Sequence, residues 1–387
     1  MKIIFFLLAS AVVALAGEPR GVVEDWNAEF LAAVRRQAPP PCLVARNLAI
    51  LHTAIWRAVR DAGTETGEAA AAGAGYEVCT VLFAGDKEGF EKLLKASPAA
   101  KGEAFEKGRM AGREVLRERE NDGANTTVHY RPDLAAGIWA RTTNNRPPEL
   151  PQWGAVRPFV LKSPDMFRPP PPPSPDSERY ARDVNEVREM GGAVSTKRTA
   201  EQEQIARFWS DFSYTTSPAG RWNEIAGRAL EGRGMGLRDK AKLFAVLNVA
   251  MADTGIAIWE CKYHYRFWRP VSAIHEDFDD KNAATKPDPA WTSLLPAPSH
   301  PDYVSGHSGF SAAAALVLTR MLGEPKEKIT VTNRDMPGVT RSFGSYEEVA
   351  IEAGCSRVYG GIHFTSANEA GGELGRKVAQ EVMKKFD

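Results

Sequence analysis

The chain has 387 residues, of which 43% are hydrophobic and 25% charged, and its 49 basic side chains balance 49 acidic ones. That composition fits a globular protein of one large domain or two ordinary ones, and it excludes both a mainly disordered chain and a multi-span membrane protein. The zero net charge argues against a nucleic-acid-binding face but leaves room for a local basic pocket.

Residues 1–16 have the pattern of a secretory signal peptide. Lys2 supplies the positive start, residues 3–15 are almost wholly apolar, and Ala14 and Ala16 are small residues at the positions that a signal peptidase reads. The apolar stretch is too short to span a bilayer well, so cleavage after Ala16 is favoured over a membrane anchor. We therefore expect a secreted or periplasmic protein without a membrane span.

Helical periodicity dominates the rest of the chain and predicts a mainly α fold. Apolar residues recur three or four positions apart, which is the spacing of one face of an α-helix. Residues 76–83 are the best candidate for a strand, and no repeat of solenoid length is present. The expected helices cover residues 43–59, 101–119, 201–212, 243–259, 309–322, 346–359 and 367–386.

A proline run at residues 169–175 interrupts the helical pattern. Such a run favours an extended polyproline II conformation and cannot be helical, so it predicts a stiff crossover rather than a ligand for an aromatic groove. We expect it to divide an N-terminal helical half, residues 17–168, from a C-terminal helical half, residues 176–387. All of the strong chemical signals lie in the C-terminal half.

The first of three basic segments runs from Trp259 to Pro270. Lys262 and Arg269 are seven positions apart, a spacing that places two residues nearly on one helix face, and Arg266 lies close to the same stripe. Their neighbours are largely aromatic, and cations are costly to bury in such surroundings without an anion. Taken alone, the segment fits a solvated helix face better than a binding site.

A second segment, residues 298–309, leads from a loop rich in proline and glycine into an alanine-rich helix. Backbone N–H groups at a helix start are unsatisfied and favour an anion. Ser305 adds a hydroxyl donor, Gly306 lets the backbone approach a ligand closely, and His307 can move protons near neutral pH. By itself, this pattern is also that of an ordinary helix N-cap.

A third segment, residues 356–369, carries Arg357 and His363. The helix expected over residues 346–359 should stop at the glycine pair that follows it, which places Arg357 in its last turn and His363 in the next connection. A planar guanidinium suits bidentate contact with a tetrahedral oxyanion, and a histidine nitrogen beside it could bond to the anion's central atom. Each residue alone also fits a surface arginine or a core histidine.

The cysteines leave two alternatives open. Cys42, Cys79, Cys261 and Cys355 are even in number and have no metal-site spacing, and an oxidising compartment would allow two disulfides. Cys261 and Cys355 each lie close in sequence to a basic residue of the expected anion site. This favours the pairs Cys261–Cys355 and Cys42–Cys79, whereas four buried free thiols are the alternative.

In chain order the three segments give K-x6-R-P, then S-G-H at a helix start, then S-R-x5-H. This combination resembles the signature shared by the vanadium-dependent haloperoxidases and the type-2 phosphatidic acid phosphatases, and it implies their helical-bundle fold. The chain is also similar to the soluble bacterial haloperoxidase branch, most clearly from Arg207 onward. The positions that carry this similarity are Phe208, Trp209, Pro218, Gly220, Trp222, Asn223, Ala252, Asp253 and Ile256 and, more faintly, residues 45–47.

The resemblance implies a pocket for vanadate or phosphate. In it His363 would bond axially to vanadium, His307 would be the acid–base as hydrogen peroxide binds, and Lys262 would also polarise the peroxide. The remaining pocket residues would surround the equatorial oxygens and balance their charge. The complete implied set is Lys262, Arg269, Ser305, Gly306, His307, Arg357 and His363.

Two further positions are implied to tune the halide. Trp259 lies three residues before Lys262, and His300 lies seven before His307. A histidine at the second position is more similar to the bromoperoxidases of the family than to its chloroperoxidases. The implied activity is therefore a secreted vanadium-dependent haloperoxidase that oxidises a halide, bromide favoured, with hydrogen peroxide, in the presence of a small organic acceptor.

Two other functions fit the same residues. One is a soluble acid phosphatase with His363 as nucleophile and His307 as general acid. The other is an oxyanion-binding protein without turnover, which the presence of both histidines argues against, because binding alone needs no proton shuttle.

The chain departs from the family pattern after the last histidine. The family often has an aspartate four residues later, where this chain has Ala367, and in the phosphatases that carboxylate orients the nucleophilic histidine. Its loss weakens the phosphatase interpretation unless Asn368 or Glu369 substitutes. Val304 also replaces the usual proline before S-G-H. The carboxylate that neutralises the site arginines stays open among Asp183, Glu186 and Glu201.

Overall fold

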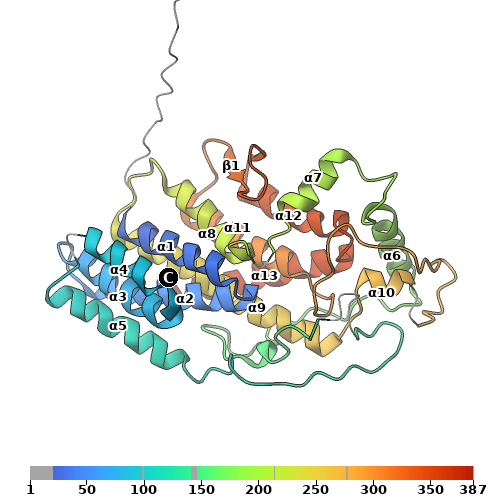
Figure 1. Ribbon diagram of the computed structural model, residues 1–387, viewed down its shortest axis with the longest axis horizontal. Helices are drawn as coiled ribbons and strands as arrows, with labels where there is room; N and C mark the ends of the chain where they lie inside the picture. Colours follow the sequence, from blue (N-terminus) through green and yellow to red (C-terminus); the bar gives the residue numbers. More distant parts are fainter. Residues whose placement is uncertain (1–20, 98–99, 141–145, 213, 276–277, 387) are drawn as a thin grey trace, which may run out of the picture.

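The computed structural model describes residues 21–386 except 98–99, 141–145, 213 and 276–277. The expected signal peptide, residues 1–16, therefore lies outside the described residues. The described part consists of helices and one two-stranded antiparallel sheet. The mainly α class predicted from the sequence is confirmed (Figure 1).

The first helices gather at one end of the molecule (Figure 1). They are α1 (Val22–Gln37), α2 (Pro41–Asp61), α3 (Gly67–Leu82), η1 (Ala84–Asp86), α4 (Lys87–Ala96) and α5 (Glu103–Arg119). The remaining elements are η2 (Trp153–Ala155), α6 (Glu178–Met190), α7 (Ala200–Phe208), α8 (Ser217–Leu230), α9 (Leu237–Tyr265), α10 (Pro270–His275), α11 (Gly306–Leu322), β1 (Ile329–Thr332), β2 (Thr340–Phe343), α12 (Tyr346–Tyr359) and α13 (Thr365–Phe386).

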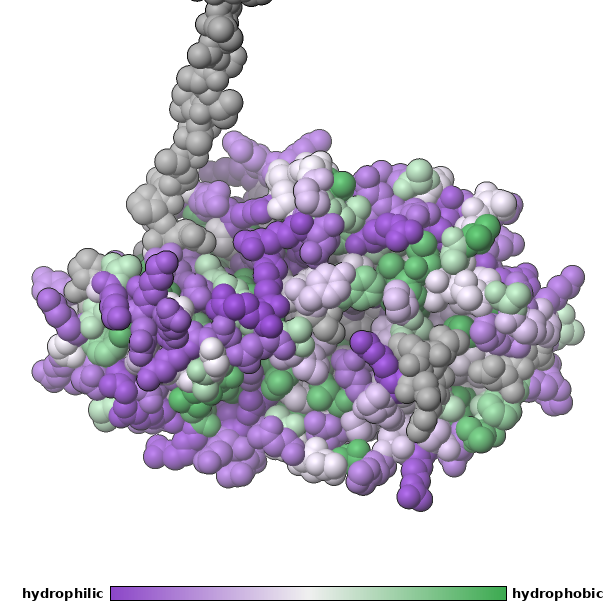
Figure 2. Space-filling model, in the orientation of Figure 1, coloured by the Kyte–Doolittle hydropathy of each residue, from purple (hydrophilic) through white to green (hydrophobic). Residues whose placement is uncertain are grey.

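Helix α9 is the centre of the core. It packs against α2 on one side and against α11 and α13 on the other. By length and composition it is the one helix of the described chain that could cross a membrane, but 94% of its most apolar window is buried inside the protein. We therefore treat it as a core helix, consistent with the largely hydrophilic face seen in Figure 2.

The expected helices are all present; the one over residues 346–359 has the predicted ends, and the others differ at one or both ends. The helix expected over residues 201–212 ends at Phe208, and the one expected over residues 243–259 extends from Leu237 to Tyr265. Hydrophobic periodicity located the helices because each buries one stripe against the core. It could not locate their ends, which depend on local caps and on neighbouring elements.

The strand predicted at residues 76–83 is wrong, because most of this segment belongs to α3. A Cβ on Gly73 would lie 2.0 Å from the carbonyl oxygen of Phe105 in α5, and one on Gly75 would lie 2.5 Å from the Trp26 ring. The small residues thus let neighbouring helices approach closely. This tertiary contact outweighs the β-branched and aromatic residues that favoured a strand.

The proline run is not helical, as expected. Its backbone carbonyls accept hydrogen bonds from two tyrosines of the site-bearing half: Tyr265 donates to Pro169 at 2.6 Å and Tyr303 to Pro170 at 2.8 Å. These bonds fix the run against the end of α9 and the loop before α11. The division at residues 169–175 into two halves stays a prediction.

All four cysteines are free, so the proposed pairs Cys42–Cys79 and Cys261–Cys355 are wrong. Cys42, Cys79 and Cys261 are buried, and Cys355 is partly exposed. Successive helical residues point about 100° apart, so a cysteine next to a site residue does not share its direction. Cys261, for example, lies beside Glu260 rather than at the anion site.

A histidine with no predicted role occupies the core between α1 and α9. His52 is 0% exposed, its ring stacks on Phe244 with centroids 4.9 Å apart, and its Nε2 lies 3.0 Å from Oδ1 of Asn27. Burial lowers the pKa of His52 to about 3. The folded protein therefore holds this ring neutral.

We expect acid to destabilise the protein through His52. Because the pKa is about 3 folded and about 6.5 unfolded, the unfolded state takes up the proton first, and stability is lost as pH falls through this window. From pH 8 to pH 5 the loss is about 2 kcal/mol. Urea unfolding at both pH values measures it. His52→Gln, which can still bond Asn27, should lose this part of the pH dependence, and an unchanged dependence would contradict the assignment.

Candidate oxyanion-binding site

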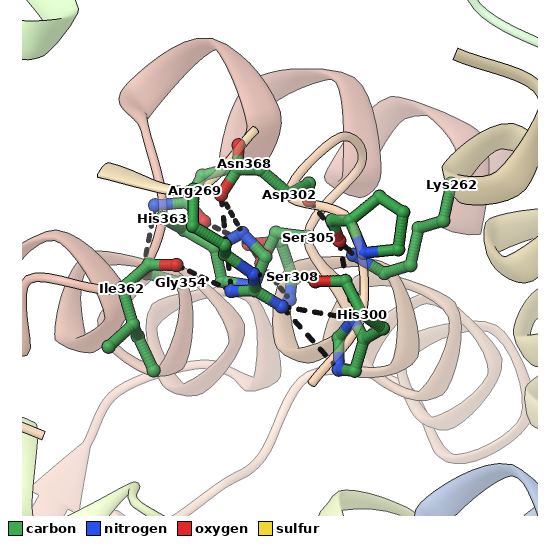
Figure 3. Close-up of polar contacts among 11 residues, drawn as sticks. Lys262, Arg269, His300, Asp302, Ser305, Ser308, Gly354, Ile362, His363 and Asn368 are labelled. Atoms are coloured by element: carbon green, nitrogen blue, oxygen red, sulfur yellow. Dashed lines mark hydrogen bonds and ion pairs between the residues drawn. The ribbon is translucent and has the colours of Figure 1, made fainter. Parts of the chain in front are cut away.

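The residues predicted from three separate segments meet around one cavity of about 120 Å³. His300, Gly306, His307, Arg357 and His363 line it directly. The side chains of Lys262, Arg269 and Ser305 are 0% exposed and join the same network of contacts (Figure 3). The fold therefore brings the end of α9, the start of α11 and the end of α12 together at one place.

Helix α9 ends before Arg269, so the predicted arrangement of this segment is wrong in part. Arg266 caps the helix in a left-handed backbone conformation, with φ 54°. Lys262 and Arg269 therefore share no helix face but still reach one region, Arg269 from the turn before α10. Arg266 points elsewhere and pairs with Asp133 at 2.9 Å.

Lys262 holds the loop that precedes α11. Its Nζ donates to the carbonyl oxygens of Pro301 at 2.7 Å and Asp302 at 2.8 Å. Burial lowers the pKa of Lys262 well below its usual value, and the nearby Arg269 lowers it further. Lys262 thus contributes a desolvated positive charge and fixes the backbone of Asp302.

Arg269 links the two histidines of the site (Figure 3). Its guanidinium donates to the carbonyl of His300 at 2.8 Å and to that of Ile362 at 2.5 Å. It also contacts Nδ1 of His300 at 2.9 Å and Nε2 of His363 at 3.2 Å. Complete burial lowers the pKa of Arg269 to about 10, so the group still carries its charge at neutral pH.

The second segment forms a helix N-terminus at the cavity, as predicted. Ser305 is the N-cap of α11, and its Oγ accepts hydrogen bonds from N–H and Oγ of Ser308. Its backbone N–H donates to the carbonyl of Ala367 at 2.9 Å. The first N–H groups of α11, beginning with Gly306, are therefore held at a fixed position beside the cavity.

Arg357 and His307 have polar atoms that no described residue satisfies. Arg357 donates through Nη1 to the carbonyl of Trp209 at 2.8 Å, but its Nε and the Nε2 of His307 have no hydrogen-bond partner in the part of the chain that the structure describes. Burial lowers the pKa of Arg357 to about 9 and that of His307 well below its usual value. The unsatisfied N–H donor of Arg357 fits a bound oxyanion, and the unpartnered Nε2 of the neutral His307 ring is a proton acceptor.

Asp211 is a site residue that the sequence did not reveal. Its Oδ2 lies 3.9 Å from Nε2 of His307, and its Oδ1 accepts from Arg221 at 2.6 Å. It is also the carboxylate whose charge acts most on Arg357. The one available signal was its position two residues after the family-like Phe208–Trp209 pair.

Asp302 is the second residue that was missed. Its Oδ1 lies 2.8 Å from Nδ1 of His363 and 4.0 Å from Nη1 of Arg269, and its side chain is 0% exposed. Burial raises the pKa of Asp302, although Arg269 and Lys262 lower it. Nothing in its sequence position marked it, because it belongs to a loop that only the fold brings beside His363.

The carboxylates considered from the sequence lie elsewhere. Asp183 pairs with Arg179, Glu186 accepts a hydrogen bond from Thr365, and Glu201 pairs with Arg341. None of them contacts a site arginine in the described structure. Among the proposed replacements for the missing aspartate, Asn368 bonds Ser308 and Gly354, and Glu369 pairs with Arg179.

The connection that carries His363 is held by backbone packing. Gly361 has φ +75°, and a Cβ there would lie 2.1 Å from the carbonyl oxygen of Gly191 at the end of α6. The carbonyl of Gly360 accepts from N–H of Leu295 at 2.9 Å. The glycine pair therefore ends α12, as predicted, and also permits close contact with another helix.

Trp259 and His300 form one wall of the cavity. Their ring centroids are 4.8 Å apart, and both are largely buried. Glu149 lines the same cavity, and its backbone carbonyl accepts from Trp259 Nε1 at 3.2 Å. Burial raises the pKa of Glu149. This wall presents an aromatic surface and a carboxyl group to whatever enters beside the oxyanion site.

The electrostatic balance of the site is positive. Lys262, Arg269 and Arg357 are buried together. The carboxyl groups near them are Asp302, Glu149, whose pKa burial raises, and Asp211, which is also paired with Arg221. Cations without water are stabilised only by an anion or by hydrogen-bond acceptors. Together with the unsatisfied donors, this excess fits a tetrahedral oxyanion such as vanadate or phosphate.

Comparisons with known proteins agree with this geometry. Residues 242–387 match the family model described as the VCPO second helical-bundle domain. The vanadium chloroperoxidase of Curvularia inaequalis is 28% identical over 235 residues, which are 45% of this chain and 38% of that protein. The match thus spans well under half of that relative.

Two solved structures are similar over nearly the whole chain. One is a bacterial vanadium-dependent iodoperoxidase, with a TM-score of 0.78 and 25% identity over 94% of this chain and 95% of its own. The other is a bacterial vanadium-dependent chloroperoxidase in its holo form, with a TM-score of 0.73 and 16% identity over 90% and 92%. At that identity, the second likeness shows the fold alone.

The chain therefore has the helical-bundle fold of the vanadium-dependent haloperoxidases, and its resemblance to that family is confirmed. It is similar along nearly its full length to a bacterial vanadium-dependent iodoperoxidase.

We expect orthovanadate or phosphate to raise the melting temperature through Arg357. At a hundred times the Kd, a ligand that binds only the folded state stabilises it by about 2.7 kcal/mol. Arg357→Ala should abolish this shift. Arg266→Ala is the matched control, because Arg266 pairs with Asp133 outside the site. Scanning calorimetry with and without each anion measures the effect, and a shift kept in Arg357→Ala would exclude Arg357 from the binding site.

Proposed function

We propose that the protein is a secreted vanadium-dependent haloperoxidase that oxidises halide, bromide favoured, with hydrogen peroxide. The observation that carries the proposal is a cavity lined by three histidines, Arg357 and a helix N-terminus, with the buried Lys262 and Arg269 in contact with these residues or with the loop before the helix. The similarity to haloperoxidases over nearly the whole chain supports it. Its partners would be hydrogen peroxide, a halide and a small organic acceptor.

Vanadate would be the cofactor. His363 would hold it through Nε2, because that nitrogen is the one that faces the guanidinium of Arg269 in the site. When bound, vanadate supplies a Lewis-acidic centre that makes hydrogen peroxide reactive towards halide. The residues that would surround its oxygens are Lys262, Arg269, Ser305, the N–H of Gly306, and Arg357.

His307 would move the protons. Burial and the charge of Arg357 lower its pKa, so the ring is neutral and can accept a proton from hydrogen peroxide. Asp211, 3.9 Å away, would stabilise the imidazolium that forms. Lys262 would contribute positive charge to the reacting oxygens, and its two carbonyl contacts keep its chain extended towards them.

An acid phosphatase that uses the same pocket is the second candidate. The absence of a carboxylate four residues after His363 argued against it. The contact of Asp302 with Nδ1 of His363 at 2.8 Å removes that objection, since it supplies a carboxylate behind the histidine from another loop. An oxyanion-binding protein without turnover is the third candidate.

The deciding experiment is a dye-bromination assay of the purified mature protein with orthovanadate and hydrogen peroxide. We expect vanadate-dependent turnover that phosphate inhibits, loss of turnover in His363→Ala, and a fall in kcat of about 10²- to 10⁴-fold in His307→Ala. Arg266→Ala should keep full activity. No bromination, together with vanadate-inhibited hydrolysis of a phosphomonoester, would establish the phosphatase instead. Vanadate binding without either turnover would leave the binding protein.

His300 is proposed to tune the halide through the wall it forms with Trp259. His300→Phe removes the ring nitrogen that contacts Arg269 at 2.9 Å and keeps an aromatic surface against Trp259. We expect the ratio of kcat/KM for chloride to that for bromide to rise severalfold. Steady-state kinetics with both halides measures the ratio, and a ratio equal to that of the wild type would remove His300 from halide selection.

The proposal also includes export of the protein and its division into two helical halves. We propose cleavage after Ala16 and an N-terminal half, residues 17–168, joined by the crossover at residues 169–175 to the half that bears the site, residues 176–387. The free cysteines are compatible with export, since three of the four are buried.

A further inference from the structure

The two ring nitrogens of His363 face opposite partners. Nε2 lies 3.2 Å from Nη1 of Arg269, and Nδ1 lies 2.8 Å from Oδ1 of Asp302 (Figure 3). An arginine guanidinium carries only donors, so a nitrogen that contacts it favourably must be an acceptor. Nε2 is therefore the unprotonated nitrogen, whose lone pair accepts from Arg269 while no anion is bound, and in the neutral imidazole the proton lies on Nδ1.

A proton on Nδ1 needs an acceptor, because the ring is buried. The carboxylate of Asp302 lies within reach as that acceptor: Oδ1 is 2.8 Å from Nδ1, and neither atom has a hydrogen-bond partner elsewhere in the described residues. The backbone of Asp302 is held at two points. The N–H of Asp302 donates to the carbonyl of Phe267 at 2.9 Å, and its carbonyl accepts from Nζ of Lys262 at 2.8 Å. The backbone that carries this carboxylate is thus fixed before any ligand binds.

We propose that Asp302 is a positioning residue that fixes His363 in the Nδ1–H tautomer and directs the Nε2 lone pair at the central atom of the bound oxyanion. The inference rests on the proposed function only for the identity of that atom, vanadium. Four residues after His363, where the family often has an aspartate, this chain has Ala367. Asp302 supplies a carboxylate from the loop before α11 instead.

A positioning role for Asp302 can be distinguished from a role in balancing the positive charge of the site. Asp302 is 4.0 Å from Arg269, so it also offsets positive charge in the site. Removing it would leave the pocket more positive and should not weaken an anion that binds by charge alone. An anion bonded to Nε2 would be weakened, because the ring would lose its fixed tautomer and orientation.

Vanadate and phosphate binding distinguish the two effects. In Asp302→Ala we expect the Kd for orthovanadate, measured by titration calorimetry, to rise by about 10- to 100-fold, while the Kd for phosphate stays the same or falls. Asp302→Asn keeps an acceptor oxygen and should lie between the wild type and Asp302→Ala for vanadate. Asp280→Asn is the matched control, since Asp280 is a buried carboxylate that accepts from Asn282 and Thr285 away from the site, and both Kd values should be unchanged.

Nitrogen NMR of histidine-labelled protein without added anion gives an independent readout. The wild type should show His363 protonated at Nδ1 alone, and Asp302→Ala should show a mixture or the Nε2–H form. An Nε2–H ring in the wild type would overturn the proposal without any variant. Equal weakening of vanadate and phosphate in Asp302→Ala would also overturn it, in favour of a merely structural role. Neither readout requires turnover, so absence of haloperoxidase activity would not decide this question.

Discussion

The burial of positive charge without matching negative charge is the constraint on which the site depends. Lys262, Arg269 and Arg357 all lie in an environment that lowers their pKa values because water is excluded, and the charge of Arg269 lowers the pKa values of Lys262 and Arg357 further. The fold tolerates this by giving Lys262 and Arg269 backbone carbonyls as acceptors. What remains unsatisfied faces the cavity, so the cost of folding these cations inward is recovered when an oxyanion binds.

Helix termini, rather than helix faces, place these groups. Helix α9 ends before Arg269, so Arg269 reaches the site from a different segment than Lys262. The start of α11 contributes backbone N–H groups, and the last turn of α12 carries Arg357. The long middle of α9 meanwhile joins α2 to α11 and α13 through apolar contacts. The middle of α9 thus forms part of the packed core, whereas the site residues lie at or beyond the ends of α9, α11 and α12.

The sequence was most informative where a pattern is local. The helix over residues 346–359 and its glycine stop, the N-cap at Ser305 and the order of the three segments could all be predicted, because each depends on neighbours in the chain. Asp302 and Asp211 could not, since their roles arise from loops that meet only in the fold. The cap at Arg266 also escaped prediction, because a non-glycine residue in a left-handed conformation has little sequence signal.

The contact of Gly361 with Gly191 gives the site an unusual kind of rigidity. The backbones of Gly361 and Gly191 are in direct contact with no side chain between them. Backbone atoms alone therefore set the distance between the end of α6 and the segment that carries His363. Changes in the aromatic wall around Trp259 can therefore alter what enters the cavity without moving the histidine. The reverse also holds: a single methyl group at either glycine would shift the connection as a whole. Substitutions in the wall and substitutions at Gly191 or Gly361 should therefore have separable effects, the first on what the cavity admits and the second on the position of His363.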